Sequence, residues 1–219
     1  MKKTVILAAV ILCATVGSAQ ELKTFKDSLS YAVGVLWGQN IKQQGITEIN
    51  SPVMGQAIDN VLAGEETMID IASANQLLRK FLSKEKEAQK SRNKAEGEAF
   101  LKKNAEREGV VTLPSGLQYE VLKEGTGPVP KSSDKVKVHY HGTLINGDVF
   151  DSSVQRGQPA SFPVTGVIKG WVEALQLMPV GSKWKLFIPS NLAYGERGAG
   201  GKIGPNAALV FEVELLAIE

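Results

Sequence analysis

A long charged segment near the middle of the chain constrains the fold more than any other feature. Between Lys84 and Arg107, 13 of the 24 residues are charged. A helix of this composition has no broad apolar face to bury, so it normally bridges two parts of a protein through solvent. We therefore expect the chain to build one structure before this segment and another after it.

The charged segment continues a helix that is predicted to begin after Asp70. An unbroken helix from there to Arg107 would be roughly 55 Å long at ~1.5 Å per residue; the alternative is a partly frayed linker. Gly97 is its expected weak point, because glycine costs ~1 kcal/mol relative to alanine in a helix. Oppositely charged pairs at i,i+4 support the polar part. The apolar face is Ile71, Ala74, Leu77, Leu78 and Phe81, and the charge pairs are Arg92/Glu96, Lys94/Glu98 and Glu98/Lys102.

Two shorter helices are predicted upstream. Asp27 or Ser28 can cap the first, which Gly45 ends, and Ser51 can cap the second, which Gly64 ends. Together with the start of the third helix they hold too few residues for an independent core. A second copy of the chain could complete that core, or the helices could pack on the C-terminal half of the same chain. Their apolar stripes are Leu29, Val33, Leu36 and Trp37, and Ala57, Ile58, Val61 and Leu62.

The first twenty residues differ from the rest. Two lysines precede an apolar run, residues 5–16, and a small-residue pattern that ends at Ala19. This is the pattern of a secretory signal peptide cut after Ala19, and the run is shorter than the ~20 residues needed to span a bilayer. Leu12 precedes Cys13 where a lipoprotein needs a small residue, which disfavours lipidation. We predict a cysteine-free mature protein in the periplasm or outside the cell, with outer-membrane association left open.

The mature chain is electrically balanced. The net charge of +2 equals Lys2 and Lys3, so basic and acidic residues are equal in number from Glu21 onward. Proteins that bind nucleic acid carry a basic surplus. The balance therefore argues against a nucleic-acid partner.

After Gly109 the hydrophobic period changes from helical to alternating. Four stretches alternate apolar and polar residues, which predicts β-strands, and Asn146-Gly147 is a strong hairpin signal. One short helix is predicted at about residues 170–177. An antiparallel sheet covering one short helix is an α+β arrangement, here preceded by an all-α region. The strand faces are Leu117, Tyr119 and Val121; Val136, Val138 and Tyr140; Trp184, Leu186 and Ile188; and Leu209, Phe211, Val213 and Leu215.

Aromatic residues gather between residues 138 and 171 with few polar companions. Asp151 and Arg156 lie among them, without a carboxylate pair or a Cys/His pair. Acid–base and nucleophilic catalysis normally use such pairs, so this pocket suits few reactions. On the pattern alone, Asp151 is equally well a turn residue of Asp-Ser-Ser. The apolar residues are Tyr140, Phe150, Phe162 and Trp171, with Val167 and Ile168 just before the tryptophan.

Two further motifs can each be interpreted as a functional site or as ordinary surface structure. His139 and His141 share one face of a strand, but no cysteine or suitably spaced carboxylate completes a site, so we predict surface histidines and no metal or other cofactor. The glycine-rich stretch from Tyr194 to Pro205 fails the phosphate-loop and dinucleotide patterns and leads into a strand. It is either a flap over a pocket or a plain surface loop.

Five short blocks follow one another in the second half of the chain: VHYHG (138–142), VFDSS (149–153), VIKGW (167–171), AYG (193–195) and LVFEVELL (209–216). Together they resemble FKBP-type peptidyl-prolyl cis-trans isomerases over residues 113–219. Three further blocks are LSYAVG (29–34), GEAFL (97–101) and LPSGLQY (113–119). These resemble the macrophage infectivity potentiator (Mip-like) branch of that family. The resemblance implies a signal peptide (1–19), a helical dimerisation domain (20–69), a long connecting helix (70–109) and an FKBP-like isomerase domain (110–219).

The resemblance also implies a role for each pocket residue. Trp171 would lie under the substrate proline ring, and the Ile168 N–H and the Tyr194 hydroxyl would bind substrate carbonyls. Asp151 would pair with Arg156 or Tyr140 and shape the site. The implied catalytic residues are Tyr140, Asp151, Ile168 and Tyr194, and the implied substrate-binding residues are Phe150, Arg156, Phe162, Val167, Trp171, Ile203 and Phe211.

The implied function is prolyl isomerisation during the folding of proline-containing envelope proteins, by a homodimer formed through the N-terminal helices. The alternative is a dimeric chaperone clamp with incidental isomerase activity. Macrolide inhibitors of the family are further implied ligands. The chain departs from many family members at positions that bear on macrolide affinity and substrate preference, namely Ala160, Gly166, Ala199 and Lys202.

Overall fold

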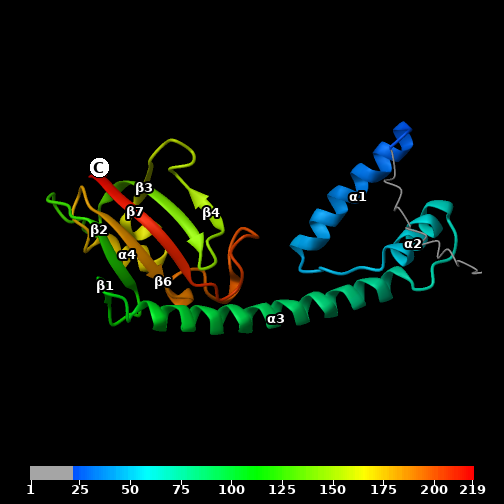
Figure 1. Cartoon of the computed structure of the whole chain (residues 1–219), viewed down its shortest axis with the longest axis horizontal. Coiled ribbons are helices and arrows are strands. Elements are labelled where there is room, and N and C mark those ends of the chain that lie inside the picture. Colours follow the sequence, from blue (N-terminus) through cyan, green and yellow to red (C-terminus); the bar gives the residue numbers. More distant parts are fainter. Residues whose placement is uncertain (1–21) are drawn as a thin grey trace, which may run out of the picture. The chain divides into compact units, whose positions relative to one another are not determined.

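The computed structural model describes residues 22–219, so the predicted signal peptide and Cys13 lie outside the described residues. The chain divides into two compact units between Ile49 and Asn50. Figure 1 shows the helices and strands along the chain. Within residues 22–219, no helix combines the length and apolar character that crossing a membrane requires.

The first unit contains α1 (Phe25–Gln43), which begins earlier than its predicted caps. Thr24 caps it: the Thr24 hydroxyl accepts the Asp27 N–H at 3.1 Å, and the Asp27 carboxylate accepts the Thr24 N–H at 2.9 Å. The prediction of Asp27 or Ser28 as the cap was therefore wrong, because Asp27 takes the return position of a capping box. The predicted end at Gly45 is confirmed: α1 ends at Gln43, and Gly45 follows the capping residue Gln44 with a positive φ of 84°. No residue of α1 is buried.

The second unit begins with α2 (Ser51–Ala63) and α3 (Ile71–Asn104). The Asn50 side chain caps α2 by accepting the Val53 N–H, so the prediction of Ser51 was wrong by one residue. Gly64 ends α2 in the left-handed conformation, and the Asp70 carboxylate caps α3 through the Ser73 N–H, as predicted.

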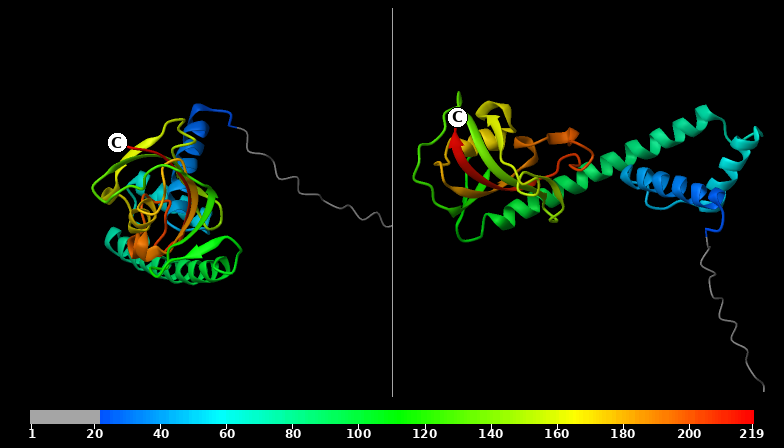
Figure 2. Two further views of the ribbon diagram at one scale, coloured as in Figure 1. Left: turned by 90° about the vertical axis from the view of Figure 1, so that its left-hand side faces the viewer. Right: turned by 90° about the horizontal axis from the view of Figure 1, so that it is seen from above.

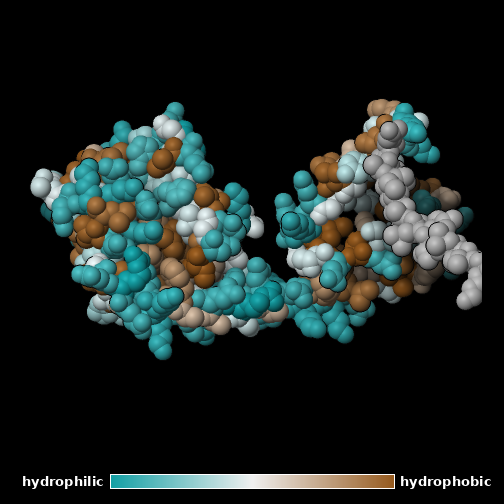
Figure 3. All heavy atoms as spheres, viewed as in Figure 1, coloured by the Kyte–Doolittle hydropathy of each residue, from teal (hydrophilic) through white to brown (hydrophobic). Residues whose placement is uncertain are grey.

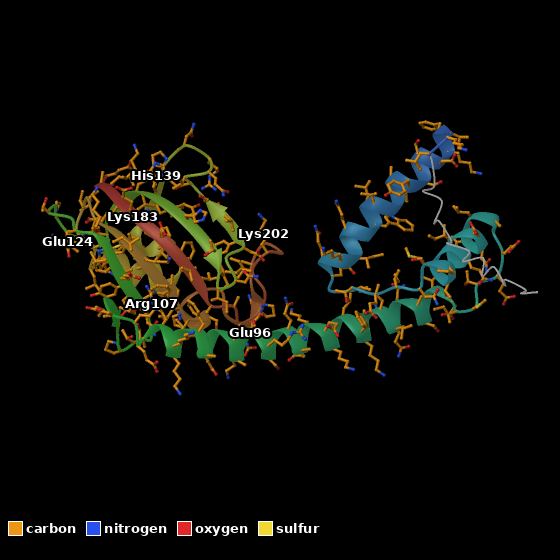
Figure 4. The ribbon with its side chains drawn as sticks, in the orientation of Figure 1. Glu96, Arg107, Glu124, His139, Lys183 and Lys202 are labelled. Carbon is orange, nitrogen blue, oxygen red and sulfur yellow. The ribbon has the colours of Figure 1, made fainter. Side chains whose placement is uncertain are left out.

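Helix α3 runs unbroken through Gly97, which agrees with the continuous helix and not with the frayed linker; the weak point expected at Gly97 stays a prediction. Gly97 and Asn104 are buried, which shows that the charged part of the helix packs against other elements of the second unit instead of only crossing solvent. The helix ends three residues before the predicted Arg107. That arginine, labelled in Figure 4, pairs with Glu120 at 2.9 Å. Among the described residues, the three predicted i,i+4 charge pairs do not form ion pairs; the pairs on this part of the helix are Lys90–Glu87 and Lys90–Glu196.

The sheet is antiparallel throughout and has the strand order β1-β2-β6-β7-β3-β4, with β5 also paired to β3. Its centre is the long pair β3–β7, and β3 pairs along its other edge first with β5 and then with β4. The short strands β1, β4 and β5 have no counterpart among the four predicted strands, although the predicted hairpin signal Asn146-Gly147 lies just before β4. The bounds are β1 Val110–Thr112, β2 Gln118–Lys123, β3 Lys135–Leu144, β4 Val149–Ser152, β5 Ala160–Pro163, β6 Lys183–Ile188 and β7 Leu209–Ile218.

Helix α4 (Lys169–Leu175) packs on the inner side of this sheet, as Figure 2 shows from two further directions. Its approach is close at Gly170, where an added Cβ would lie 2.6 Å from Ile188. The predicted fold class is confirmed: an antiparallel sheet wraps one short helix and follows an all-α region. The fully buried core includes Leu117, Val136, Val138, Leu175, Met178, Leu186, Ile188, Leu209, Val213 and Leu215.

Candidate active site

A cavity of about 580 Å³ opens between the sheet, the N-terminus of α4 and the loop that precedes β7. Strand β3 contributes Tyr140, and α4 contributes Trp171. Residues far apart in the sequence therefore meet because the inner face of the sheet curves around α4. The full lining is Tyr140, Phe150, Asp151, Phe162, Gly166, Val167, Ile168, Trp171, Tyr194, Ala199, Gly200, Lys202, Ile203 and Phe211.

Aromatic rings hold one another in edge-to-face contacts around Trp171. Its ring lies 5.5 Å from Tyr140, 6.1 Å from Phe162 and 5.2 Å from Phe211, at interplanar angles between 80° and 90°. This is the geometry that aromatic quadrupoles favour. The rings therefore form a rigid apolar surface, which a small apolar ring could enter without rearranging them.

Gly142 makes this packing feasible. A Cβ at this position would lie 2.7 Å from the Phe211 ring and 2.8 Å from the Phe150 ring. Any larger residue would therefore push the two walls apart. The glycine follows Tyr140 by two residues on β3, so its missing side chain leaves room on the cavity side of the strand.

The polar groups of the cavity are bonded mainly to one another. The Tyr140 hydroxyl donates to the Asp151 carboxylate at 2.5 Å and accepts a hydrogen bond from Arg156 at 2.7 Å. Arg156 also pairs directly with Asp151 and lies over the Tyr140 ring, 5.5 Å from its centre. Tyr140, Asp151 and Arg156 therefore form a closed triad, in which each group contacts the other two and the charges are complementary.

The triad holds its protonation states through neutral pH. Burial alone would raise the pKa of Asp151, but hydrogen bonds from Tyr140 and Arg156 hold that pKa below its ordinary value. Burial, followed by the hydrogen bond to Asp151, raises the pKa of Tyr140. Neither group is therefore poised to exchange a proton near pH 7.

Two donors around the cavity have no partner among the described residues. The Ile168 carbonyl accepts the Trp171 and Val172 N–H groups at 2.9 and 3.0 Å, while no hydrogen bond from its own N–H to residues 22–219 is found. The Trp171 indole N–H is likewise buried and unpaired within the described chain. The Ile168 N–H is thus available to a carbonyl that enters the cavity, whereas the Trp171 nitrogen is covered by protein atoms.

The structure brings ten of the eleven predicted site residues to the cavity wall; Arg156 lies behind the wall and contacts it through Asp151 and Tyr140. Four further residues line the cavity. Three of them, Gly166, Ala199 and Lys202, coincide with departures from the family pattern, and Gly200 was missed. The glycine-rich run beside Tyr194 was the signal that could have included it.

The two histidines lie apart from this cavity. His139 and His141 are hydrogen-bonded to the Ser153 and Ser152 hydroxyls, at 3.1 and 3.0 Å. Among residues 22–219, no group of three or more His, Cys, Asp or Glu side chains is arranged to hold a metal ion.

The chain is 45% identical over 208 residues to the outer membrane protein MIP of Legionella longbeachae, covering 92% of this chain and 89% of that protein. It is 46% identical over 198 residues to an FKBP-type 22 kDa peptidyl-prolyl cis-trans isomerase of Escherichia coli K12, covering 89% and 96%. The chain belongs to the FKBP-type peptidyl-prolyl cis-trans isomerases.

Family models and a solved structure agree with this membership. Residues 127–216 match the model of the FKBP-type peptidyl-prolyl cis-trans isomerase domain, and residues 26–121 match that of the domain amino-terminal to it. The crystal structure of FkpA from Escherichia coli superposes with a TM-score of 0.71 at 34% identity, covering 91% of this chain and 99% of that one. The resemblance to the Mip-like branch, and the enzyme class it implied, are thus confirmed.

Proposed function

We propose that this FKBP-type isomerase rotates X–Pro bonds in unfolded or partly folded proteins of the cell envelope without a covalent intermediate. One observation carries the mechanism: the cavity is built largely of aromatic rings, and its one carboxylate, that of Asp151, is engaged with Tyr140 and Arg156. Such a site can bind and desolvate a proline, but it offers no free nucleophile or acid–base pair.

The rotation barrier of the X–Pro amide explains why desolvation and hydrogen bonding are sufficient for catalysis. Amide resonance makes rotation cost ~18–20 kcal/mol, and an uncatalysed X–Pro bond takes tens to hundreds of seconds to turn. The planar amide is more dipolar than the twisted one, so a dry cavity disfavours the ground state more than the transition state. Donors aimed at the twisted carbonyl add binding that exists only in the transition state.

Each site residue then has a role. Trp171 is the surface under the proline ring, and Phe150, Phe162 and Phe211 are walls. The Ile168 N–H, unpaired among residues 22–219, and the Tyr194 hydroxyl bind the substrate carbonyls. Asp151 and Arg156 fix the Tyr140 ring and close that side of the cavity. Val167 and Ile203 complete the apolar lining.

A protease-coupled assay on a proline tetrapeptide tests these roles. Asp151→Asn and Tyr194→Phe should each lower kcat/KM about 10-fold, since each removes hydrogen bonds worth roughly 1–3 kcal/mol. Glu124→Gln, an exposed carboxylate labelled in Figure 4, serves as the control. Full activity of both site variants, with unchanged thermal midpoints, would reject the assignment.

We propose export as the cellular context. A basic start, a short apolar run and the small residues before Gln20 support removal of residues 1–19. A relative is named an outer membrane protein, which supports an envelope location and keeps outer-membrane association within the proposal. The mass of the protein recovered from the producing cells should correspond to a chain that starts at Gln20. A lipid-modified Cys13, or an uncut chain, would contradict this.

The N-terminal helices support a homodimer. No residue of α1 or α2 is buried, although both helices carry large apolar side chains. Leu36 is 65% exposed and Leu62 is 80% exposed in the single chain. Figure 3 shows such hydrophobic surface in brown. Sedimentation equilibrium of the mature chain should give twice the chain mass, and a monomer at micromolar concentration would reject the proposal.

The same exposed surface favours a second candidate, a dimeric chaperone clamp with incidental isomerase activity. The two are separated by one pair of measurements on the wild-type chain and on Tyr194→Phe. If Tyr194→Phe loses turnover but still suppresses aggregation of an unfolded client as well as wild type, holding clients is an activity of its own. Macrolide inhibitors should compete with the tetrapeptide and leave aggregation suppression unchanged if they bind the cavity.

A further inference from the structure

The loop that forms one wall of the active site has a second face, which rests on α3. We call residues 194–208 the flap. Tyr194, Lys202 and Ile203 of the flap line the cavity, and Figure 4 labels Lys202 there. The opposite side of the flap, around Gly204 to Asn206, contacts the charged half of α3. Both views of Figure 2 show this loop beside the helix.

Two side-chain amides join the helix and the flap, one from each, and each donates to a backbone carbonyl of the other element. The Asn93 side chain donates to the Pro205 carbonyl at 2.7 Å, and the Asn206 side chain donates to the Lys90 carbonyl at 3.4 Å. The Asn93 bond lies in a partly buried place, where losing a hydrogen bond leaves a polar group unpaired. The flap is therefore joined to the helix at two consecutive residues, Pro205 through its carbonyl and Asn206 through its side chain.

An ion pair and two close approaches surround these bonds. Lys90 reaches Glu196 at 2.7 Å. A Cβ on Gly204 would lie 2.7 Å from the Asn93 amide, and a Cβ on Gly97 would lie 3.1 Å from the Ala208 Cβ. The contact residues of α3 include Lys90, Asn93 and Gly97, which recur at spacings of three and four and share one face of the helix. The Gln89 amide also lies close to Gly204, 3.1 Å from the position of an added Cβ.

Backbone hydrogen bonds close the flap at its base and at its tip, and they link its rear to its cavity side. The Asn206 N–H donates to the Gly195 carbonyl at 2.8 Å and closes the base of the flap. Asn206 does this with a φ of 56°, the left-handed conformation that asparagine tolerates better than most residues. At the tip, Ala199 and Ile203 exchange two backbone hydrogen bonds of 2.9 and 3.0 Å. Tyr194 and Ile203 are consequently held by the same closed loop that α3 contacts.

We propose that the charged half of α3 positions the active-site flap: Lys90, Asn93 and Gly97 hold the rear of the flap so that Tyr194 and Ile203 meet the substrate. These three are positioning residues, since none of them lines the cavity. The proposal rests on the proposed roles of Tyr194 and Ile203, and it makes the connecting helix part of the catalytic unit.

The first test measures kcat and KM of the full mature chain on a proline tetrapeptide. Asn93→Ala should lower kcat/KM about 3- to 10-fold, the effect of one lost hydrogen bond. A displaced flap raises KM, whereas a loss of folded protein lowers kcat and leaves KM unchanged. Asn75→Ala is the matched control, because Asn75 is exposed on the same helix and bonds only to Ile71.

The second test is a charge exchange. Lys90→Glu and Glu196→Lys should each raise KM, and the double variant should recover at least half of the loss, because it restores the attraction in reverse. A merely structural weakening by the two single variants would accumulate in the double variant. Lys86→Glu, an exposed lysine one turn away, is the control for the change in net charge.

The third test uses the close approach at Gly97. Gly97→Leu should push the flap away and lower kcat/KM about 10-fold or more, since a close-packed contact does not accept a larger side chain. Ala95→Leu adds the same side chain at an exposed position of the helix and should stay within about twofold of wild type, because surface changes are usually nearly neutral. If Gly97→Leu fails to fold, the first two tests decide.

The outcomes separate this proposal from the site assignment. Wild-type KM in Asn93→Ala and in both charge variants would overturn it, whatever Tyr194→Phe does. Raised KM in these variants, with charge-exchange rescue, supports it. If Tyr194→Phe is then fully active, the flap acts through Ile203, and the role given to Tyr194 is the part that fails.

Discussion

The two halves of α3 differ in a way that their composition does not suggest. The first half carries the apolar residues, yet Ile71 is 81% exposed and Leu77 is 64% exposed in the single chain. The second half is mostly charged, yet it contains the two buried residues of the helix, Gly97 and Asn104. The apolar half lies open, and the charged half is packed.

The difference shows that a helix can dock without an apolar stripe. The charged half uses a glycine for close approach, side-chain amides for backbone carbonyls, and one partly buried lysine, Lys90, that pairs with Glu196. An amide bonded to a carbonyl needs a partner at one place and one angle, which gives a defined position more than a large free energy. An apolar face needs only a surface to cover it, and a second copy of the chain would supply one.

The largest expected effect concerns the apolar half. Leu77→Asp should raise the dissociation constant of the proposed dimer about 100-fold or more, because each subunit loses roughly 1.5–3 kcal/mol of apolar burial and would bury a charge. Activity on a tetrapeptide should stay within twofold of wild type. Ala95→Asp places the same carboxylate on the charged half as a control. Sedimentation velocity over a dilution series makes the measurement, and an unchanged dimer would contradict a role for this half in assembly.

The next effect concerns the buried amide network at the end of the charged half. The Asn104 side chain donates to the Gln118 side chain at 2.8 Å, and Gln118 donates to the Leu101 carbonyl at 2.9 Å. Asn104→Leu should lower the free energy of unfolding by about 1–3 kcal/mol, because it leaves a buried acceptor without its donor. Urea unfolding followed by tryptophan fluorescence measures this. Asn75→Leu on the apolar half is the control, and equal losses in the two variants would remove the distinction between the halves.

A smaller effect concerns the pH dependence of stability that the Lys90–Glu196 ion pair gives to the charged half of α3. Hydrogen bonding and attraction to Lys90 lower the pKa of Glu196, with Lys94 adding attraction, and the pKa of Lys90 is raised, chiefly by its hydrogen bond to Glu196 and further by Glu87. A lowered acid pKa stabilises the fold fully above the ordinary value of 4.5 and loses that contribution as the pH falls through the folded value. The raised lysine pKa keeps its contribution up to the ordinary 10.5 and loses it as the pH rises further.

The thermal midpoint of wild type should therefore exceed that of Glu196→Gln at pH 5 to 9, and the difference should shrink below pH 4.5. Glu196 faces solvent, so we expect a small difference that salt reduces. Glu66→Gln is the control, because Glu66 is exposed in the loop between α2 and α3. A difference that persists unchanged at pH 3 would show that the ion pair does not contribute.

The smallest effect is expected at Glu87. Its carboxylate lies 4.0 Å from Lys90 on the same helix and is 69% exposed. Because exposed pairs of this kind contribute little, Glu87→Gln should leave both the thermal midpoint and kcat/KM indistinguishable from wild type. A clear loss of activity would show that Glu87, and not Glu196, sets the position of Lys90.

Much of the fold could be read from local patterns. The helix starts and ends were predicted to within a few residues, with errors at Thr24 and Asn50 because several adjacent residues can serve as a cap. The long strands were predicted because one face is buried and alternation is strong. Strands β1, β4 and β5 are three or four residues long, too short for alternation to register.

The site could be predicted only in part. Ten residues reached the cavity because aromatic and β-branched residues stand in recognisable blocks. The position of Arg156 behind the wall depends on its bond to the Tyr140 hydroxyl, which no spacing encodes. Gly200 was missed because a glycine leaves no side-chain signal, only backbone that happens to face the cavity.

The sequence by itself determined the enzyme family and the period of the long elements, because these depend on local composition and order. Tertiary structure alone decided that the charged half of that helix is packed. Asn93, Gly97 and Asn104 find their partners 14 to 112 residues away, at Pro205, Ala208 and Gln118. Small and amide side chains do not contribute to hydrophobic periodicity, so their contacts cannot be predicted from the sequence pattern. They form only when the folded sheet places the flap and β2 beside the helix.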